Sequence, residues 1–178
     1  ILLEEKNGSG TYTDEPRYDW AFTVVRQLLY AVSKKIRLQS LQQSSYEPLA
    51  HVAIKIAMEH TYHLLHWEVW FKQLMSSTEE ARQRMEAALD RTWLDFGGVL
   101  TLGPYAEKMA EAGLIESETM LKKRCLKAMD AYFQQVGFTV ESEPGLAKGD
   151  GRRGEYTADL TEALKTLSEV YRLEPQEA

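Results

Sequence analysis

The sequence predicts an all-α protein built as an antiparallel helix bundle. Apolar residues recur at intervals of three and four over several long stretches, which is the period of a helix with one buried face. Short segments rich in serine, proline or glycine separate these stretches, and no run alternates apolar and polar residues as a strand would. The 178 residues, 44% of them apolar, are enough for one domain, 1–178, with a sizeable core. Long helices joined by short turns lie antiparallel, so we expect a bundle.

The first two predicted helices are long. The first spans about 18–42, with Asp19 as its N-cap. The second begins at Pro48, which suits a first helical turn, and runs to about Met75. Apolar residues occur on most sides of this second helix, so we expect it to be buried among several neighbours. These residues are Leu49, Val52, Ile54, Ile56, Leu64, Leu65, Trp67, Val69, Trp70 and Phe71.

A capping box predicts where the third helix begins. In the run Ser77-Thr78-Glu79-Glu80, the Ser77 hydroxyl would cap the helix, and the Glu80 carboxylate would reach back to the capping residue. The glycine pair at 97–98 would end this helix. We expect its acidic residues to form an ordinary solvated face; they are Glu86, Asp90 and Asp95.

Three further helices and one long loop complete the predicted fold. A short helix at 104–112 and a long one at about 116–136 are each ended by a glycine. The segment 138–155 contains one proline and four glycines and is predicted to be a loop. Loops of this length in a compact domain are functional, pinned by a partner or disordered. A final helix would span about 156–172.

The composition excludes several classes of protein. The net charge of -6 is the opposite of the basic excess that binding to nucleic acid requires, so we expect no nucleic-acid partner. No apolar run approaches the roughly 20 residues that cross a bilayer, and no secretory signal opens the chain. We therefore expect a cytoplasmic protein without a membrane partner. The chain opens on Ile1 rather than methionine, from which we expect that part of the natural N-terminus is missing.

Cys125 is the single cysteine of the chain. One cysteine excludes an intrachain disulfide and a cysteine-based zinc site, and it fits a reducing compartment. The basic side chains of Lys122, Lys123 and Arg124 precede it, and their charge would lower the pKa of the thiol. No histidine lies near it in the sequence, so we expect no catalytic role for Cys125.

The second predicted helix carries all four histidines of the chain, namely His51, His60, His63 and His66. Residues three and four apart share a helix face, so Lys55, Glu59, His63 and His66 form one stripe. On a buried helix these groups must be paired, because an unpaired buried charge is costly. We interpret Lys55, Glu59 and His63 as a buried or half-buried ladder of ion pairs and hydrogen bonds. Two alternatives stay open: a single metal ion held by Glu59 with His60, His63 or His66, and histidines that face a partner or solvent.

The spacing on this helix does not match a di-iron site. Di-iron carboxylate bundles take Glu-x-x-His from each of two helices and one glutamate from each of two others. Here the residue three after Glu59 is Tyr62, and the histidine follows at His63, about 100° further round the helix. The preceding helix has no Asp or Glu between Trp20 and Gln43. We therefore predict no catalytic residue and no metal ligand in this chain, with Glu59 and His63 as candidates for a vestigial site.

Two other groups of residues have simpler interpretations. Trp67, Trp70 and Phe71 are expected in the core or at a subunit interface rather than around a cofactor. The glycines of the long loop lack the order of a P-loop and the lysine that follows it. Arg152 and Arg153 could contact a phosphate such as that of coenzyme A, although an exposed basic pair in a loop is usually not specific.

Three segments, in order, resemble the family of non-catalytic C subunits of phenylacetyl-CoA epoxidases. They are Leu2-Leu3-Glu4-Glu5 followed by Tyr18-Asp19-Trp20-Ala21-Phe22-Thr23-Val24-Val25-Arg26-Gln27, then Lys55-x-x-x-Glu59-x-x-Tyr62-His63-Leu64-x-His66, then Arg84-Met85-x-x-Ala88-Leu89-Asp90-x-x-Trp93. The tail Gly154-Glu155-Tyr156-Thr157 resembles the family's closing helix but departs from the His-Thr-Glu common there. The resemblance spans essentially the whole chain and corresponds to the C-terminal two-thirds of a family member, which implies that one or two N-terminal helices of the bundle are missing.

The resemblance implies a ferritin-like fold and tight association with a homologous catalytic subunit. In the family, that partner holds the iron pair and inserts one oxygen atom of O2 into the ring of phenylacetyl-CoA. The non-catalytic subunit holds no cofactor and acts as a scaffold, while a small bridging subunit and a reductase are further expected partners. Two alternative functions stay open: a self-sufficient ferritin-like oxidoreductase that binds metal through Glu59 and His63, and a helical protein-binding module.

Overall fold

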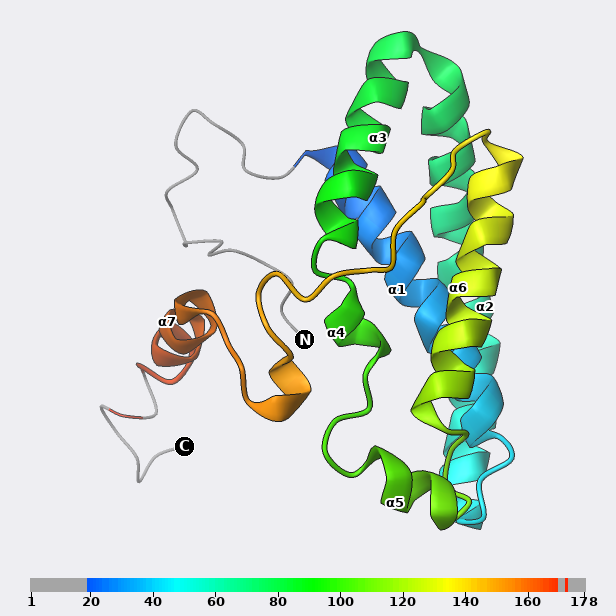
Figure 1. Ribbon diagram of the computed structural model, residues 1–178, viewed down its shortest axis with the longest axis vertical. Coiled ribbons are helices and arrows are strands. Elements are labelled where there is room, and N and C mark those ends of the chain that lie inside the picture. Colours follow the sequence, from blue (N-terminus) through cyan, green and yellow to red (C-terminus); the bar gives the residue numbers. More distant parts are fainter. Residues whose placement is uncertain (1–18, 170–171, 173–178) are drawn as a thin grey trace.

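The computed structural model describes residues 19–169 and 172, and every regular element within them is helical. The prediction of an all-α fold is confirmed. Four long helices, α1, α2, α3 and α6, run side by side along the long axis of the molecule (Figure 1). The helices are α1 Trp20–Leu41, α2 Glu47–Ser77, α3 Glu79–Trp93, α4 Gly97–Leu100, α5 Ala106–Glu111, α6 Glu118–Gln135 and α7 Ala158–Leu167, with a 3-10 turn, η1, at Gly151–Arg153.

Helix α1 is the centre of the bundle. It packs against α2, α3 and α6, and it also contacts α4. The carboxylate of Asp19 caps its first turn by accepting a hydrogen bond of 2.9 Å from the backbone N–H of Phe22, as the sequence predicts. Most of its apolar side chains are almost completely buried; these include Val24, Val25, Leu28, Leu29 and Val32.

Helix α2 is buried on one face only. The expectation that it is surrounded by neighbours is wrong within the described part of the chain, because α1 occupies the central position instead. Its buried residues recur at helical spacing and face α1 and α3; they are Ala50, Ala53, His60, Leu64, Phe71 and Met75. Apolar residues on the other sides of α2 therefore remain exposed.

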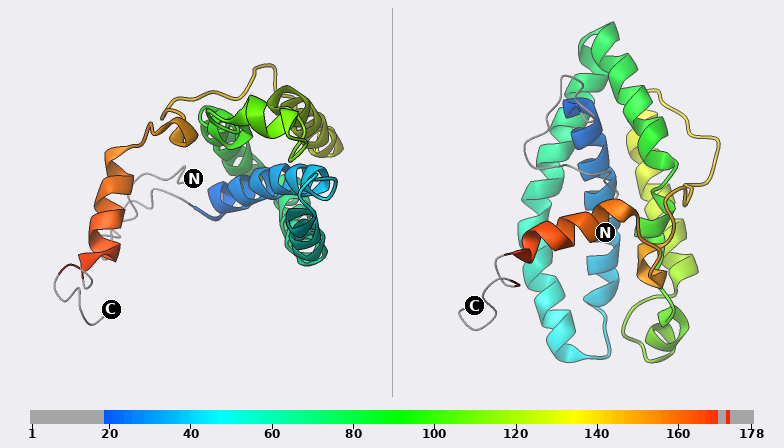
Figure 2. Two further views of the ribbon diagram at one scale, coloured as in Figure 1. Left: turned by 90° about the horizontal axis from the view of Figure 1, so that it is seen from below. Right: turned by 90° about the vertical axis from the view of Figure 1, so that its left-hand side faces the viewer.

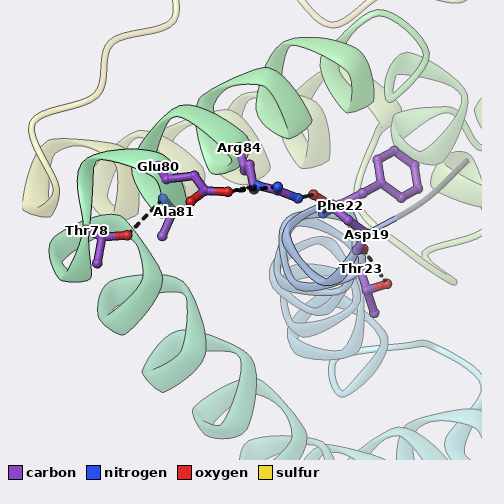
Figure 3. Close-up of polar contacts among 7 residues, drawn as sticks. All are labelled: Asp19, Phe22, Thr23, Thr78, Glu80, Ala81 and Arg84. Carbon is purple, nitrogen blue, oxygen red and sulfur yellow. Dashed lines mark hydrogen bonds and ion pairs between the residues drawn. The ribbon is translucent and has the colours of Figure 1, made fainter. Parts of the chain in front are cut away.

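The connection between α2 and α3 is shorter than the sequence predicts, because only Thr78 separates the two helices. Helix α2 continues through Ser77, and Thr78 rather than Ser77 caps α3 by accepting a hydrogen bond of 3.1 Å from the N–H of Ala81. Glu80 does not reach back to the cap. It accepts a hydrogen bond of 2.8 Å from Arg84, and Arg84 also lies 3.5 Å from the Asp19 carboxylate of α1 (Figure 3).

The segment 138–155 is pinned by the bundle itself. The N–H of Gly145 donates to the carbonyl of Trp93 at 2.9 Å, and the N–H of Gly97 donates to the carbonyl of Gly145 at 2.8 Å. Helix α3 already ends at Trp93, so Gly97 begins α4 rather than ending α3. A Cβ on Gly97 would lie 2.6 Å from the Gly145 oxygen, so glycine is required there by this close approach.

The last helix, α7, stands apart from the four long helices (Figure 2). It spans Ala158–Leu167, within the predicted 156–172, and none of its residues is buried. Its leucines Leu164 and Leu167 are exposed. Among the described residues, no helix is both long and apolar enough to span a membrane.

Candidate functional site

The polar stripe on α2 lies on the surface. His63 and Glu59 approach each other with an Nε2–Oε1 distance of 3.7 Å, and both side chains are largely exposed. Lys55 and His66 are exposed as well. The predicted burial of the Lys55, Glu59 and His63 ladder is therefore wrong for this chain, although the Glu59–His63 pair itself forms. The physical reason is that α2 has only one covered face, and these residues point away from it.

The buried histidine is His60, one turn from the stripe. Its Nε2 atom lies 2.8 Å from the carbonyl oxygen of Ala31 on α1. A carbonyl only accepts, so Nε2 carries the proton and donates. Burial lowers the pKa of His60 below its ordinary value, which favours the neutral imidazole. His60 is thus a hydrogen-bonded core residue, a role that its spacing on the buried face of α2 could have indicated.

The described residues do not fit a di-iron centre. No group of three or more His, Cys, Asp and Glu side chains within 19–169 and 172 is close enough to hold a metal ion. Helix α1, which packs against α2, carries no carboxylate between Trp20 and Leu41. Glu68, on another side of α2, is engaged by a hydrogen bond from the phenol of Tyr132 on α6.

A row of exposed apolar side chains follows the outer side of α2. At about 100° per residue, positions 54, 58, 62, 65 and 69 fall within an arc of about 80°, well away from the side that faces α1. Their exposed fractions lie between 45% and 77%. We call this row the α2 stripe; it consists of Ile54, Met58, Tyr62, Leu65 and Val69.

The aromatic residues at the far end of α2 divide between the core and its edge. Phe71 is completely buried. Trp67 and Trp70 are half-buried and pack against Trp20 of α1, with ring centroids 6.1 and 5.6 Å away. The core interpretation is confirmed for Phe71, and the two tryptophans cover the N-terminal end of α1.

A cleft of about 480 Å3 lies where the 101–105 connection, the pinned segment 145–151 and the start of α7 meet. Arg152 lines this cleft, whereas Arg153 is exposed, with its Nε atom 3.5 Å from the Asp150 carboxylate. Asp150 is almost completely buried and caps η1 by accepting from the N–H of Arg152 at 2.9 Å. The structure therefore gives the two predicted arginines different surroundings.

Two sequence expectations about side chains that prove to be buried need correction. Asp95 is not on a solvated face: it is buried, and its Oδ1 accepts a hydrogen bond of 2.8 Å from the N–H of Lys148. The pKa of Cys125 is raised rather than lowered, because the thiol is buried between helices. The charges of Arg37 and Arg124 oppose this effect but are outweighed by the loss of solvation.

Sequence analysis missed Arg37, a residue that ties α1 to the cleft. Its guanidinium donates to the carbonyl oxygens of Val99 and Thr101, the latter at 2.9 Å. The Thr101 hydroxyl in turn lies 3.1 Å from the Asp150 carboxylate. The sequence could have indicated this role, because Arg37 lies on an otherwise apolar helix face and a buried guanidinium must find hydrogen-bond acceptors.

The described residues thus define an all-helical bundle with one exposed apolar helix face and no cluster of metal-binding side chains. Comparison with known proteins identifies its family. A model of the phenylacetic acid catabolic proteins matches residues 2–178, and the chain belongs to this family. It is also similar to the C subunit of the 1,2-phenylacetyl-CoA epoxidase of Escherichia coli, with 22% identity over 162 residues. The match covers 91% of this chain and 65% of the relative, so the chain spans less than two thirds of that protein's length.

Proposed function

We propose that the chain is a non-catalytic structural subunit of a multicomponent di-iron monooxygenase that epoxidises the ring of phenylacetyl-CoA in aerobic phenylacetate catabolism. It would work in the cytoplasm, in a complex with a homologous catalytic subunit, a small bridging subunit and a reductase. The observation that carries this proposal is the α2 stripe. The family and the similarity to the Escherichia coli epoxidase protein support it.

The α2 stripe has the form of a surface that receives another helix. Its residues are spaced four, four, three and four apart, which is the spacing of side chains that interlock with the side chains of a neighbouring helix. Fully burying one large apolar side chain stabilises an assembly by about 1.5–3 kcal/mol, so a partner that covers several of the five gains substantially. A ferritin-like arrangement, in which homologous helices pack in this way, is part of the proposal.

The role of this subunit would be to hold the helices of its partner rather than to carry iron. The iron pair would be held by the catalytic subunit. In this chain Glu59 and His63 contact each other at the surface, and α1 contributes no acidic ligand. The vestigial-site interpretation of Glu59 and His63 fits this arrangement.

The proposal is tested by co-expression of the full chain with the homologous catalytic subunit. Val69→Glu places a charge within the α2 stripe, and Val52→Glu places the same charge on the same helix outside it. Both valines are 53% exposed, so the two variants are matched in chemistry and burial. We expect Val69→Glu to weaken co-purification of the catalytic subunit at least about tenfold, because a charge would be buried in the interface, and Val52→Glu to retain it.

The same preparations measure function. Phenylacetyl-CoA epoxidation is assayed with the bridging subunit and the reductase supplied, with and without this chain. Full epoxidation by the catalytic subunit in the absence of this chain would exclude the structural role. Equal loss of binding in both valine variants would exclude the α2 stripe as the interface.

Each alternative function has its own discriminating measurement. A self-sufficient oxidoreductase requires near-stoichiometric metal in the purified chain that is lost in Glu59→Gln and His63→Gln. A general helical binding module would remain a stable monomer in the presence of the catalytic homologue and bind a different protein through the α2 stripe.

A further inference from the structure

The cleft beside η1 has the size and the lining of a small-molecule site. Its volume of about 480 Å3 falls within the roughly 300–1,000 Å3 typical of ligand pockets. Two aromatic side chains line it, Tyr105 and Tyr156, and both are exposed. Lys148 and Arg152 contribute positive charge to the same walls. Nothing in the α2 stripe or in the proposed subunit role requires this cleft.

Arg152 is the unusual residue of the cleft. Its Nε atom is buried and has no hydrogen-bond partner, and its side chain forms no ion pair with a described residue. The Cβ and backbone of Arg152 pack against Gly103, where an added Cβ would lie 3.1 Å from the Arg152 Cβ. A buried donor without a partner is costly, by roughly 1–3 kcal/mol or more for a charged group.

The carboxylates around the cleft accept hydrogen bonds from donors other than the Arg152 guanidinium. The Oδ1 atom of Asp95 accepts from the N–H of Lys148 at 2.8 Å. The Oε2 atom of Glu155 accepts from the N–H of Asp150 at 2.8 Å. Asp150 itself accepts from the N–H of Arg152 and from Thr101. None of these acidic groups neutralises the Arg152 guanidinium directly.

A second guanidinium lies near enough to Arg152 for the two positive charges to act on each other. Arg37 lies behind the cleft, and its donors are directed to the carbonyl oxygens of Val99 and Thr101. Burial lowers the pKa of Arg37, and the positive charge of Arg152 lowers it further. The positive charge of Arg152 thus acts on Arg37 and is only partly opposed by the Glu118 carboxylate, and an anion in the cleft would stabilise both guanidinium groups.

We propose that this cleft binds a small organic oxyanion, a carboxylate or a phosphate carried on a planar body, with Arg152 as its anchor. A guanidinium presents parallel N–H donors that match the two oxygens of either group. The rings of Tyr105 and Tyr156 offer aromatic surface to the planar body, and their hydroxyls can donate hydrogen bonds. The phosphates of coenzyme A, which the sequence also suggests for Arg152 and Arg153, are one source of such an oxyanion.

Isothermal titration of the full chain tests the site with two anionic probes and their neutral counterparts. Adenosine 3′,5′-bisphosphate represents a phosphate on a purine, and benzoate represents a carboxylate on a phenyl ring. Adenosine and benzamide have the same planar bodies without the charge. We expect one of the two anions to bind and its neutral counterpart to bind at least about tenfold more weakly, and the anion that binds identifies the source.

Two variants assign the binding to the cleft. Arg152→Gln should weaken the bound anion at least about tenfold, whereas Arg153→Gln, on the exposed neighbour, should leave it within about twofold. Because the buried Nε of Arg152 has no hydrogen-bond partner to lose, Arg152→Met should fold with an unchanged or raised Tm and lose the rise in Tm that the anion produces. Failure of both anions to bind, or unchanged binding in Arg152→Gln, would overturn the proposal. These results are independent of co-purification through the α2 stripe.

Discussion

The imidazole of His60 and the backbone of Ala31 join the middle of α2 to the central helix: Nε2 of His60 lies 2.8 Å from the Ala31 oxygen. This contact places one titratable group inside the bundle. Its three fellow histidines on α2 are exposed. The stability of the bundle should therefore depend on pH through His60 more than through the others.

Acidification should destabilise the chain through His60. Burial lowers the pKa of His60 below 6.5, its value in an unfolded chain, so the folded protein binds fewer protons than the unfolded one. The contribution of the neutral imidazole is complete above pH 6.5 and is lost as the pH falls below it. His60→Gln retains a donor near the Ala31 oxygen but does not titrate. Urea unfolding at pH 7.5 and pH 5.5 should show a smaller loss of stability for His60→Gln than for the wild type.

Adjacent glycines in α4 should respond differently to the same substitution. A Cβ on Gly97 would lie 2.6 Å from the Gly145 oxygen and 2.9 Å from the Pro144 oxygen, both backbone atoms. On Gly98 the nearest atom would be 3.5 Å away, an ordinary contact. We expect Gly97→Ala to lower the free energy of unfolding by about 1–3 kcal/mol and Gly98→Ala to change it by less than about 1 kcal/mol. Equal effects in urea titrations would contradict the close approach of segment 144–145.

The N-cap of α1 should tolerate a change of charge but not the loss of its acceptor. Asp19→Ala removes the hydrogen bond to the Phe22 N–H and should cost about 0.5–2 kcal/mol of stability. Asp19→Asn keeps an acceptor and loses only the exposed ion pair with Arg84, so its effect should be small. Thermal unfolding of the three proteins distinguishes the two contributions. A loss for Asp19→Asn as large as that for Asp19→Ala would show that the ion pair, rather than the cap, dominates.

Cys125 should react slowly in the folded protein. Burial raises the pKa of the thiol, and the residue is only 2% exposed. Because the thiolate is the reactive form, labelling with a chromogenic disulfide should be at least about tenfold slower in native buffer than in denaturant. The chain has a single cysteine, so one thiol accounts for the whole signal, and Cys125→Ser supplies the blank. Comparable rates in both conditions would place the thiol at the surface.

The helices themselves could be predicted because each depends on local chemistry. The Asp19 cap, the proline at the start of α2 and the helical period of apolar residues are read directly from neighbouring positions. A cap is harder to assign when two adjacent residues could both supply it. Ser77 and Thr78 both have a suitable hydroxyl, and the structure uses Thr78 because α2 extends further than predicted.

What could not be predicted is which helix lies in the middle. Both α1 and α2 are apolar on several sides, and periodicity alone does not reveal which neighbours cover those sides. The sequence pattern therefore places the polar stripe of Lys55, Glu59 and His63 in the interior, although it lies on the surface. The surroundings of Arg152 could not be inferred either, because they depend on Gly103 and Arg37, which are distant in the sequence.

The hydrogen bonds between Gly145 and residues Trp93 and Gly97 have a consequence for the folding order of the chain. They bring together positions about 50 residues apart and enclose α4, α5 and α6 within one loop of the chain. Closing such a loop costs conformational entropy before its contacts are made, so these bonds should form after the neighbouring helices α1 to α3 have paired. The close approach at Gly97 thus forms late in folding. In native-state hydrogen exchange, the N–H groups of Gly97 and Gly145 should therefore exchange before those in the core of α1.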